Sequence, residues 1–249
     1  MLRKLYKLLH LQQNCINYIF KKMVKLNKWT TLIVLMGLFG TSCQKNENLE
    51  PDKTENFDIT NHYIAGTISP KSDSYKSIYL IKLLADNKAV FMGTGNDLTG
   101  SYSLTKDSLI VVVENKDNFR TARFAINEKH ELTSAYYRAL AMEYKTTGTL
   151  IKIPEQNMLS GKTFKGEEFK MGPALNKSSW FYKFSSTDLN YGAAEQLSGL
   201  ETKNQYELIN NSAFKYKNGN TTEIGFVVDK QLTVFRSSGL FYFGAYQQQ

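Results

Sequence analysis

The strongest constraint on the fold is an internal duplication. Five short blocks of sequence recur in the same order, and each lies 95 to 104 residues after its counterpart. Repeats of this length form small structural units that bury their apolar faces, and a unit of this size can fold by itself. The sequence therefore predicts two related units, residues 58–153 and residues 154–249. The matched positions are Gly66 with Gly161, Tyr79 with Phe181, Tyr102 with Tyr206, Phe124 with Phe226, and Leu132 with Leu232.

Each copy has the pattern of short β-strands. Residues 109–113 form a continuous apolar run rich in valine and isoleucine, which indicates a strand buried on both faces. Phe124 and Phe226 each begin a strand that leads through a polar turn into another apolar run, as in a β-hairpin. Turn signals roughly every 8–12 residues are typical of antiparallel sandwiches and barrels. The sequence therefore predicts an all-β fold.

Two points of the architecture stay open. Residues 133–145 have helical propensity, but the matching stretch 233–243 is rich in Val, Phe and Tyr, so we expect strands in both copies. Pro154 and the polar residues up to Asn157 form the expected joint between the copies, since proline ends a strand. The antiparallel meander then closes either as one barrel or sandwich shared by both halves, or as two small barrels.

A secretory signal precedes the repeats. Residues 23–42 consist of a basic segment with Lys25 and Lys28, an apolar run of about a dozen residues, and small residues directly before Cys43. The run is shorter than the ~20 residues that a membrane-spanning helix needs, and it fits a signal peptide. Its end resembles the lipobox of bacterial lipoproteins in the looser form of Bacteroidetes, because Gly40 stands where leucine is usual. The resemblance implies lipidation of Cys43. The alternatives are a cleaved secretory peptide with a free cysteine, and an N-terminal membrane anchor.

The segments on either side of the signal have simpler interpretations. Residues 1–22 are a gene-start artefact or an extended leader, because Met23 is a suitable start, and Cys15 has no expected function. Residues 43–57 are polar, so burial cannot offset their ordering entropy, and we expect a flexible tether. The Lys and Glu residues behind Cys43 resemble the surface-export signals of Bacteroidetes lipoproteins. We therefore expect an outer-membrane lipoprotein, with surface display favoured over the periplasmic face.

The charge distribution argues against a nucleic-acid partner. The chain has a net charge of +8, but residues 1–42 contain seven basic residues and no acidic one. The remaining residues carry 24 basic and 23 acidic groups, so the folded part is nearly neutral. It lacks the basic stripe that nucleic-acid binders present. Only two cysteines are present, which excludes a disulfide framework and a cysteine-based zinc site.

Catalytic motifs do not occur in the sequence after Cys43. Its two histidines, His62 and His130, stand outside any serine-hydrolase or zinc-protease motif. Glu167 and Glu168 are adjacent carboxylates, but neighbours on a strand point to opposite faces. Glycoside cleavage needs two carboxylates about 5–9 Å apart, so an envelope enzyme acting on glycans is kept as an alternative. The sequence predicts no catalytic residue, no metal site and no cofactor.

Aromatic side chains give the clearest binding signal. Trp180, Tyr182, Tyr136 and Tyr242 stand in aromatic clusters, and consecutive side chains of a strand face opposite sides. One side of each cluster must lie outside the core unless a second layer covers it. Exposed Trp and Tyr stack on sugars and form interface hot spots, although aromatic residues are also common in strands. We expect these four residues to contact a ligand.

The order of the repeated blocks resembles the lipocalin-like repeats of small bacterial lipoproteins. In each copy a glycine near the first strand is followed by an aromatic strand, a Tyr-x-Leu segment and a hairpin that ends in Leu-Thr. The resemblance covers about 180 residues and implies an antiparallel meander. We therefore expect a non-enzymatic, lipid-anchored cell-envelope protein that binds a glycan, a small apolar ligand or a protein partner. A structural subunit of an outer-membrane assembly is a further alternative.

Overall fold

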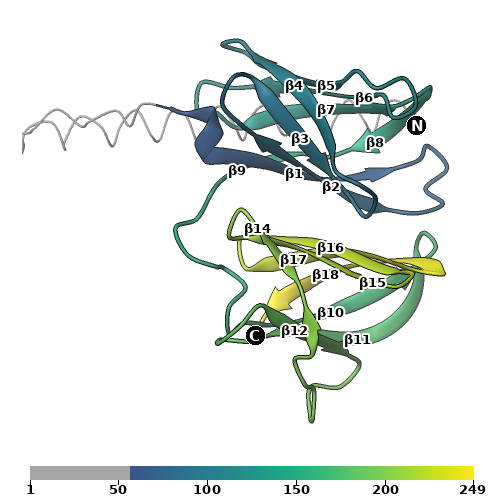
Figure 1. Cartoon of the computed structure of the whole chain (residues 1–249). Helices are drawn as coiled ribbons and strands as arrows, with labels where there is room; N and C mark the ends of the chain where they lie inside the picture. The colour runs from purple at the N-terminus through teal and green to yellow at the C-terminus, as the bar shows by residue number, and fades with distance from the viewer. Residues whose placement is uncertain (1–56) are drawn as a thin grey trace, which may run out of the picture. The chain divides into compact units, whose positions relative to one another are not determined.

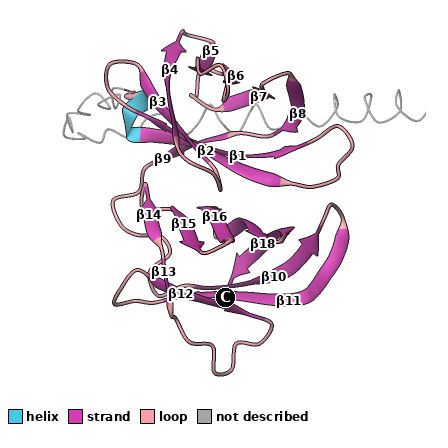
Figure 2. Cartoon of the chain, turned by 45° about the vertical axis from the view of Figure 1, so that its right-hand side comes forward, coloured by secondary structure: helices cyan, strands magenta, loops and turns pink. Residues whose placement is uncertain are grey.

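The chain folds almost entirely into antiparallel strands. The computed structural model describes residues 57–249; the leader, Cys43 and nearly all of the predicted tether lie outside the described residues. Within this part, helical structure is confined to the short 3₁₀ turn η2 (Ile59–Asn61), drawn in cyan in Figure 2. No described helix has the length and apolarity needed to cross a membrane. The predicted all-β class is confirmed.

The first sheet is a closed antiparallel barrel, which we call barrel 1. From β1 to β8 each strand pairs with the next, and β1 also pairs with β8 and β9, so that the sheet closes on itself. Closure leaves few unpaired strand edges. The strands are β1 (His62–Ser69), β2 (Ser77–Leu83), β3 (Lys88–Met92), β4 (Leu98–Leu104), β5 (Ser108–Val113), β6 (Arg120–Ile126), β7 (Leu132–Ala139), β8 (Met142–Thr146) and β9 (Thr149–Lys152).

The second sheet is a nearly closed barrel, barrel 2, drawn in green and yellow in Figure 1. Here β10 takes the place of β1 and pairs with β11 and β18. The sheet ends in two short strands on either side of Tyr206, and these do not pair with each other. The strands are β10 (Thr163–Lys170), β11 (Ala174–Phe184), β12 (Asn190–Ala194), β13 (Asn204–Gln205), β14 (Glu207–Ile209), β15 (Ala213–Asn218), β16 (Thr221–Val228), β17 (Gln231–Ser238) and β18 (Leu240–Gln248).

The two barrels match strand for strand, as expected for a repeat. β13 and β14 together take the place of β4, and β18 takes the place of β8 and β9. Tyr102 and Tyr206 occupy equivalent inward-facing positions, and so do Leu132 and Leu232. Of the two predicted arrangements, the chain adopts two barrels.

The predicted match of Gly66 with Gly161 is wrong. Gly161 lies in a turn before β10, with a φ of 69°. The strand glycine that corresponds to Gly66 is Gly166, because Gly66 pairs with Tyr79 on β2 and Gly166 pairs with Trp180 on β11.

The predicted matches of Tyr79 with Phe181 and of Phe124 with Phe226 are wrong, because the two members of each pair lie on opposite faces of their sheets. Phe181 lies between the inward-facing Trp180 and Tyr182, so it points out of barrel 2, whereas Tyr79 points into barrel 1. Phe226 likewise packs outside barrel 2, whereas Phe124 packs inside barrel 1. A slip of one residue along a strand moves every side chain to the other face, so an alignment by residue type alone is easily misled.

Most of the predicted strands and turns are present. Residues 133–145 form β7 and β8, which meet at a turn where Leu140 has a φ of 53°, so the expectation of strands is confirmed. The hairpin between β16 and β17 turns at Asp229 and Lys230, both with positive φ. The prediction that residues 109–113 are buried on both faces is wrong, because burial alternates along β5.

Three apolar clusters hold residues 57–249 together. One fills each barrel, and the third packs the outer faces of β1, β2 and β3 against those of β14 to β17. Alternation produces this division: Ile64 points into barrel 1, while Tyr63 and Ala65 belong to the third cluster. The Tyr63 hydroxyl also lies 2.7 Å from the Ser212 hydroxyl. Both barrels therefore form one compact unit.

Candidate functional site

Three of the four aromatic residues predicted to contact a ligand lie in barrel 2. Trp180 and Tyr182 on β11, and Tyr242 on β18, share the strand parity of the core residues and face the interior. Trp180 and Tyr242 are half-buried, whereas Tyr182 is 1% exposed and belongs to the core. Tyr136 lies on β7 of barrel 1, so the structure does not bring it together with the other three.

Three charged side chains lie beside Trp180 and Tyr242. They are Glu168 on β10, Glu223 on β16 and Arg236 on β17, and we call them the charged cluster. Glu168 is 1% exposed and Glu223 is 5% exposed, while the Arg236 side chain is 18% exposed. Ionisable groups at this depth are costly unless they pair. We call this end of barrel 2 the mouth.

Regular alternation along β10 positions Glu168 inside the barrel, because Glu168 shares the strand parity of the core residue Phe164 and the pairing of β10 with β18 is unbroken. The register between β10 and β11 shifts between Gly166 and Phe169, with the extra residues of these β-bulges on β11, so Glu168 pairs with Lys177. Bulges bend a strand and re-aim its side chains, and β10 and β11 curve at this end in Figure 2. Gly166 is needed here, because a Cβ atom would lie 2.2 Å from the carbonyl oxygen of Ala245 on β18.

The Glu168 carboxylate is fully paired. Its Oε2 accepts a hydrogen bond from Arg236 Nη2 at 2.5 Å, and its Oε1 accepts one from Asn176 Nδ2 at 2.7 Å. Charge-assisted hydrogen bonds of this kind are about twice as strong as neutral ones. Glu168 therefore serves as the fixed counter-charge of Arg236.

The Glu223 carboxyl group is less well paired. Its Oε1 lies 3.8 Å from Arg236 Nε, which is too long for a hydrogen bond, and its Oε2 has no partner among the described residues. Burial raises the pKa of Glu223 to about 7; Arg236, Tyr191 and Tyr182 oppose this rise, and Glu168 adds to it. Glu223 therefore gains or loses its proton near neutral pH.

Two aromatic rings flank the Arg236 guanidinium. Its central carbon lies 4.1 Å from the centre of the Tyr242 ring and 5.4 Å from the centre of the Trp180 ring. Both contacts are cation–π interactions. Burial lowers the pKa of Arg236, but Tyr182, Glu168 and Glu223 outweigh this effect and raise it. Arg236 therefore stays charged.

Four buried polar atoms around the cluster have no hydrogen-bond partner among residues 57–249. They are Trp180 Nε1, Tyr191 Oη, Glu223 Oε2 and Arg236 Nε. The Tyr191 hydroxyl lies close enough to Glu223 for burial and the carboxylate to raise its pKa, but it does not reach hydrogen-bond geometry. Each unsatisfied buried group costs about 1–3 kcal/mol. The described side chains alone therefore do not satisfy all the hydrogen-bonding atoms of this site.

Barrel 1 shows that the fold does not need the cluster. Strand pairing places Ile68 where barrel 2 has Glu168, because both face the strand that closes the barrel. The cross-strand neighbours Glu223 and Arg236 correspond to Ala122 and Tyr137. All three equivalents in barrel 1 are apolar or aromatic. A closed barrel of this topology therefore forms without buried charge at these positions.

Exposed apolar side chains gather at turns at one end of the strands, four of them in barrel 2 beside the mouth and two in the β7–β8 turn of barrel 1. Of the ten exposed large apolar residues in the described part of the chain, six lie at the turns at this end of the strands, with 37% to 55% of each exposed. Met171 N donates to the Phe241 carbonyl at 3.0 Å, and the Phe241 ring lies 5.3 Å from that of Tyr75, so turns of both barrels meet here. We call these six residues the apolar rim: Leu140, Met142, Met171, Leu175, Leu240 and Phe241.

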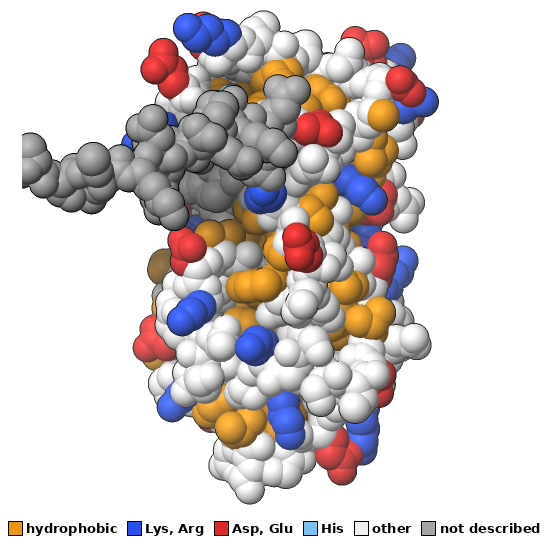
Figure 3. All heavy atoms as spheres, turned by 90° about the vertical axis from the view of Figure 1, so that its left-hand side faces the viewer, with side chains coloured by type: hydrophobic (Ala, Val, Ile, Leu, Met, Phe, Trp, Pro, Cys, Tyr) orange, Lys and Arg blue, Asp and Glu red, His pale blue; other side chains and the backbone are white. Residues whose placement is uncertain are grey.

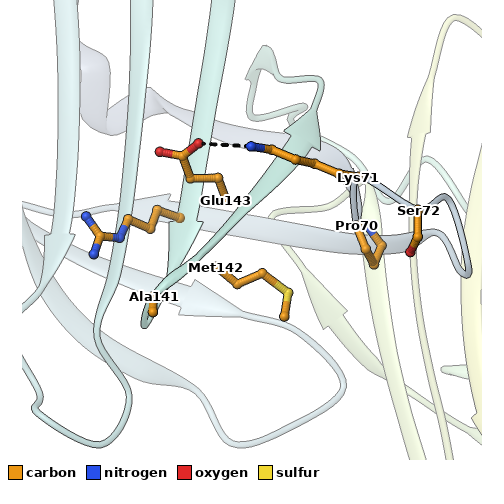
Figure 4. Close-up of a pocket in the computed structure, with 7 residues that line it drawn as sticks. Pro70, Lys71, Ser72, Ala141, Met142 and Glu143 are labelled. Carbon is orange, nitrogen blue, oxygen red and sulfur yellow. Dashed lines mark ion pairs between the residues drawn. The ribbon is translucent and has the colours of Figure 1, made fainter.

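Tyr136 lies next to a separate surface depression on barrel 1. Its hydroxyl donates to Glu143 Oε1 at 3.0 Å, and its ring faces the Arg123 guanidinium at 5.9 Å. Lys71 Nζ lies 3.5 Å from Glu143 Oε2 across the depression, as the dashed line in Figure 4 shows. The depression is lined by Pro70, Lys71, Ser72, Arg138, Ala141, Met142 and Glu143. These exposed ion pairs are weak, so this is a secondary candidate.

The remaining candidates from the sequence separate in the structure. Glu167 is exposed and Glu168 is buried, so the adjacent carboxylates do not form a pair. His130 lies in the β6–β7 turn and stacks on Phe57 with ring centres 3.7 Å apart. No group of three His, Cys, Asp or Glu residues suited to a metal ion occurs within the described part of the chain. Arg236 and Glu223 do not belong to any sequence motif. The only signal that could have identified them as site residues is a charged side chain at a strand position that faces inward.

Comparisons with protein-family models, with curated proteins and with solved structures give no match to this chain. The fold and site define a two-barrel antiparallel β protein with a buried charged cluster at one mouth. Its function is therefore inferred from the residues of that mouth.

Proposed function

We propose that this protein is a lipid-anchored cell-envelope lipoprotein that binds a ligand or partner without enzymatic activity. The anchor is Cys43, which follows the predicted signal peptide. The binding end is the mouth of barrel 2, where Trp180 and Tyr242 flank Arg236 inside the apolar rim.

The single observation that carries the binding function is the position of the apolar rim. Six large apolar side chains remain exposed at one end of the strands, and such clustering marks interaction sites. The described chain begins at the other end of barrel 1, where Phe57 stacks on His130 in the β6–β7 turn. The apolar rim therefore lies at the end of the strands away from residue 57, where the described part of the chain begins.

The surface charges favour a partner that is not a nucleic acid. On the side of the molecule that lies on the left in Figure 1, Figure 3 shows Lys and Arg side chains interspersed with Asp and Glu over the part that is in view. No stripe of one charge sign crosses that part, whereas a protein that binds a phosphate backbone presents a stripe of positive charge.

The alternative of a glycan-cleaving enzyme is less well supported. Glu168 and Glu223 are two carboxyl groups near one another, and the raised pKa of Glu223 would suit a general acid. However, Asn176 and Arg236 occupy both oxygens of Glu168, and neither carboxyl group is open to solvent. A nucleophile or base needs a free oxygen that reaches the substrate.

The anchor is tested by metabolic labelling with palmitate in a bacterium that processes lipoproteins. The wild-type chain is expected to incorporate label, and globomycin is expected to block its processing. The Cys43→Ser variant should lose the label, while Cys15→Ser should keep it. Label that persists in Cys43→Ser would reject the lipid anchor.

The binding end is tested by site-specific photo-crosslinking in intact cell envelopes. A photoreactive amino acid replaces Leu240 in the rim or Leu104, which lies at the other end of barrel 1. The two leucines are matched, with 37% and 39% of their surface exposed. We expect discrete crosslinked products from position 240 and none from position 104. Equal products from both positions would reject the rim as the binding end.

A further inference from the structure

We infer that the mouth of barrel 2 is a binding site for a neutral saccharide. This inference rests on the proposed binding function and names the chemical class of its ligand. It assigns the sugar ring to the half-buried side chains of Trp180 and Tyr242, and the sugar hydroxyls to the partly exposed polar side chains beside the charged cluster, Thr221, Ser238 and Asn176.

The side chains at the mouth have the chemistry of a sugar site. Thr221 Oγ1 and Ser238 Oγ lie 2.9 Å apart, and strand parity places both on the inner face with Glu223 and Arg236. Asn176 adds an amide next to Glu168. Sugars carry hydroxyl groups that both donate and accept, so they suit a site that mixes hydroxyl, amide, carboxyl and guanidinium groups.

The unpartnered atoms specify donors and acceptors in the same small region. Trp180 Nε1 and Arg236 Nε need acceptors, Glu223 Oε2 needs a donor while it is ionised, and Tyr191 Oη can take either role. An anion would satisfy only the donors of this set, and a cation would satisfy only its acceptor. A hydroxyl group satisfies both kinds of atom, because its oxygen accepts while its hydrogen donates.

The charge balance of the mouth favours a ligand without charge. Glu168 and Arg236 neutralise each other, so Glu223 sets the net charge of the cluster. A protonated Glu223 leaves the cluster neutral, and a charged ligand would then bring an unbalanced charge into a desolvated site. An ionised Glu223 leaves the cluster net negative, so it repels anionic ligands.

The aromatic rings complete the site. Tyr242 and Trp180 are half-buried around Arg236, so part of each side chain remains exposed at the mouth. The carbon-bound hydrogens of a pyranose ring stack on the faces of such rings. Barrel 1 has Tyr144 at the position of Tyr242 but lacks all three charged residues, so it serves as an internal negative control.

Trp180 provides a fluorescent reporter of sugar binding at the mouth. The chain has two tryptophans, Trp29 in the leader and Trp180, so residues 44–249 contain Trp180 alone. This segment includes every described strand and all three apolar clusters, so it is expected to fold by itself. Its tryptophan fluorescence is titrated with maltose, cellobiose and N,N′-diacetylchitobiose, and with glucuronic acid and glucosamine as charged probes.

We expect a saturable fluorescence change with at least one neutral disaccharide, at millimolar or lower concentration. Tyr242→Ala should weaken binding by roughly tenfold or more, which corresponds to the loss of about 1.4 kcal/mol. Thr221→Val, a smaller change, should also weaken it, whereas Tyr136→Ala in barrel 1 should not. Circular dichroism verifies that each variant is folded.

Three results would overturn the inference. They are no saturation with any neutral sugar, unchanged binding in Tyr242→Ala, and a preference for a charged sugar. Release of reducing ends during incubation would instead indicate the enzymatic alternative. Crosslinking at Leu240 without sugar binding would reject this inference and leave the proposed function in place.

Discussion

Glu223 and Arg236 are direct cross-strand neighbours on β16 and β17, and the same register pair in barrel 1 is Ala122 and Tyr137. One barrel thus fills this position with a buried acid and base, and the other fills it with a methyl group and an aromatic ring. Because the strands of the two barrels match in order and barrel 1 closes without these charges, a barrel of this kind does not need them in order to form. Function is the usual reason for keeping a buried group that costs stability.

The first prediction concerns removal of the cluster. Arg236→Met should destabilise the protein by about 3–5 kcal/mol, because two buried carboxyl groups lose their counter-charge. The triple variant Glu168→Ile, Glu223→Ala, Arg236→Tyr installs the residues of barrel 1 and should be more stable than Arg236→Met. Urea unfolding at neutral pH measures both. If the triple variant is no more stable than Arg236→Met, the charges are structural.

The second prediction concerns pH. The pKa of Glu223 is about 7 in the folded chain and near 4.5 when unfolded, so the folded state holds the proton more tightly. Stability contributed by this group is present below pH 4.5 and is lost as pH rises to about 7, by up to about 3 kcal/mol. Glu223→Gln cannot lose a proton. Its stability relative to the wild type should therefore rise between pH 4.5 and pH 8.

Urea unfolding of both proteins at the two pH values tests this prediction. Glu143→Gln is the control, because Glu143 is exposed and the Tyr136 hydrogen bond and Lys71 lower its pKa. That variant should not gain stability relative to the wild type as pH rises. A constant difference between Glu223→Gln and the wild type would contradict the raised pKa.

The third prediction concerns the contact between the barrels. Tyr63→Phe removes the buried hydrogen bond to Ser212, at a cost of about 1–2 kcal/mol. The Ser212 hydroxyl keeps a second contact, as it lies 3.2 Å from the Asn210 carbonyl, which limits the loss. Tyr136→Phe removes an exposed hydrogen bond and should cost less than about 0.5 kcal/mol. Chemical denaturation measures the loss of stability in each variant. Equal losses in the two variants would contradict the expectation that the buried Tyr63 hydrogen bond contributes more than the exposed one of Tyr136.

The fourth prediction concerns the glycine of β1. Gly66→Ala would place a Cβ atom 2.0 Å from the Thr147 carbonyl oxygen and 2.6 Å from the Tyr79 ring. Backbone cannot yield here without opening the barrel seam, so we expect a loss of several kcal/mol, on the order of 3. Gly95→Ala meets nothing within 4 Å and should be nearly neutral. Thermal unfolding compares the two, and a tolerated Gly66→Ala would show that the seam is loose.

The sequence was a good guide to strands and a poor guide to their register. The hairpin turn at Asp229 and Lys230 could be predicted, because the polar pair separates two apolar runs. The match of Phe124 with Phe226 failed because the apolar residues of β16 serve two cores. Phe226 packs outside the barrel with the third cluster, while Val227 packs inside.

The aromatic part of the site could be predicted in part. Trp180 and Tyr242 stood out by residue type, and the structure places both beside Arg236. Tyr136 stood out equally, but it lies in the other barrel, on an exposed strand where its hydroxyl binds Glu143. Residue type identifies a side chain that can bind a ligand, and only the fold decides which of them meet.

By itself the sequence determined an antiparallel β chain written twice, because strand alternation and turn residues are local properties. The tertiary structure alone decided that Glu168, Glu223 and Arg236 share one interior. Glu168 is far from Glu223 and Arg236 in the chain, and what unites the three is a common parity on strands that curve around one barrel. Such coincidence depends on register over long sequence separations, which no local pattern encodes.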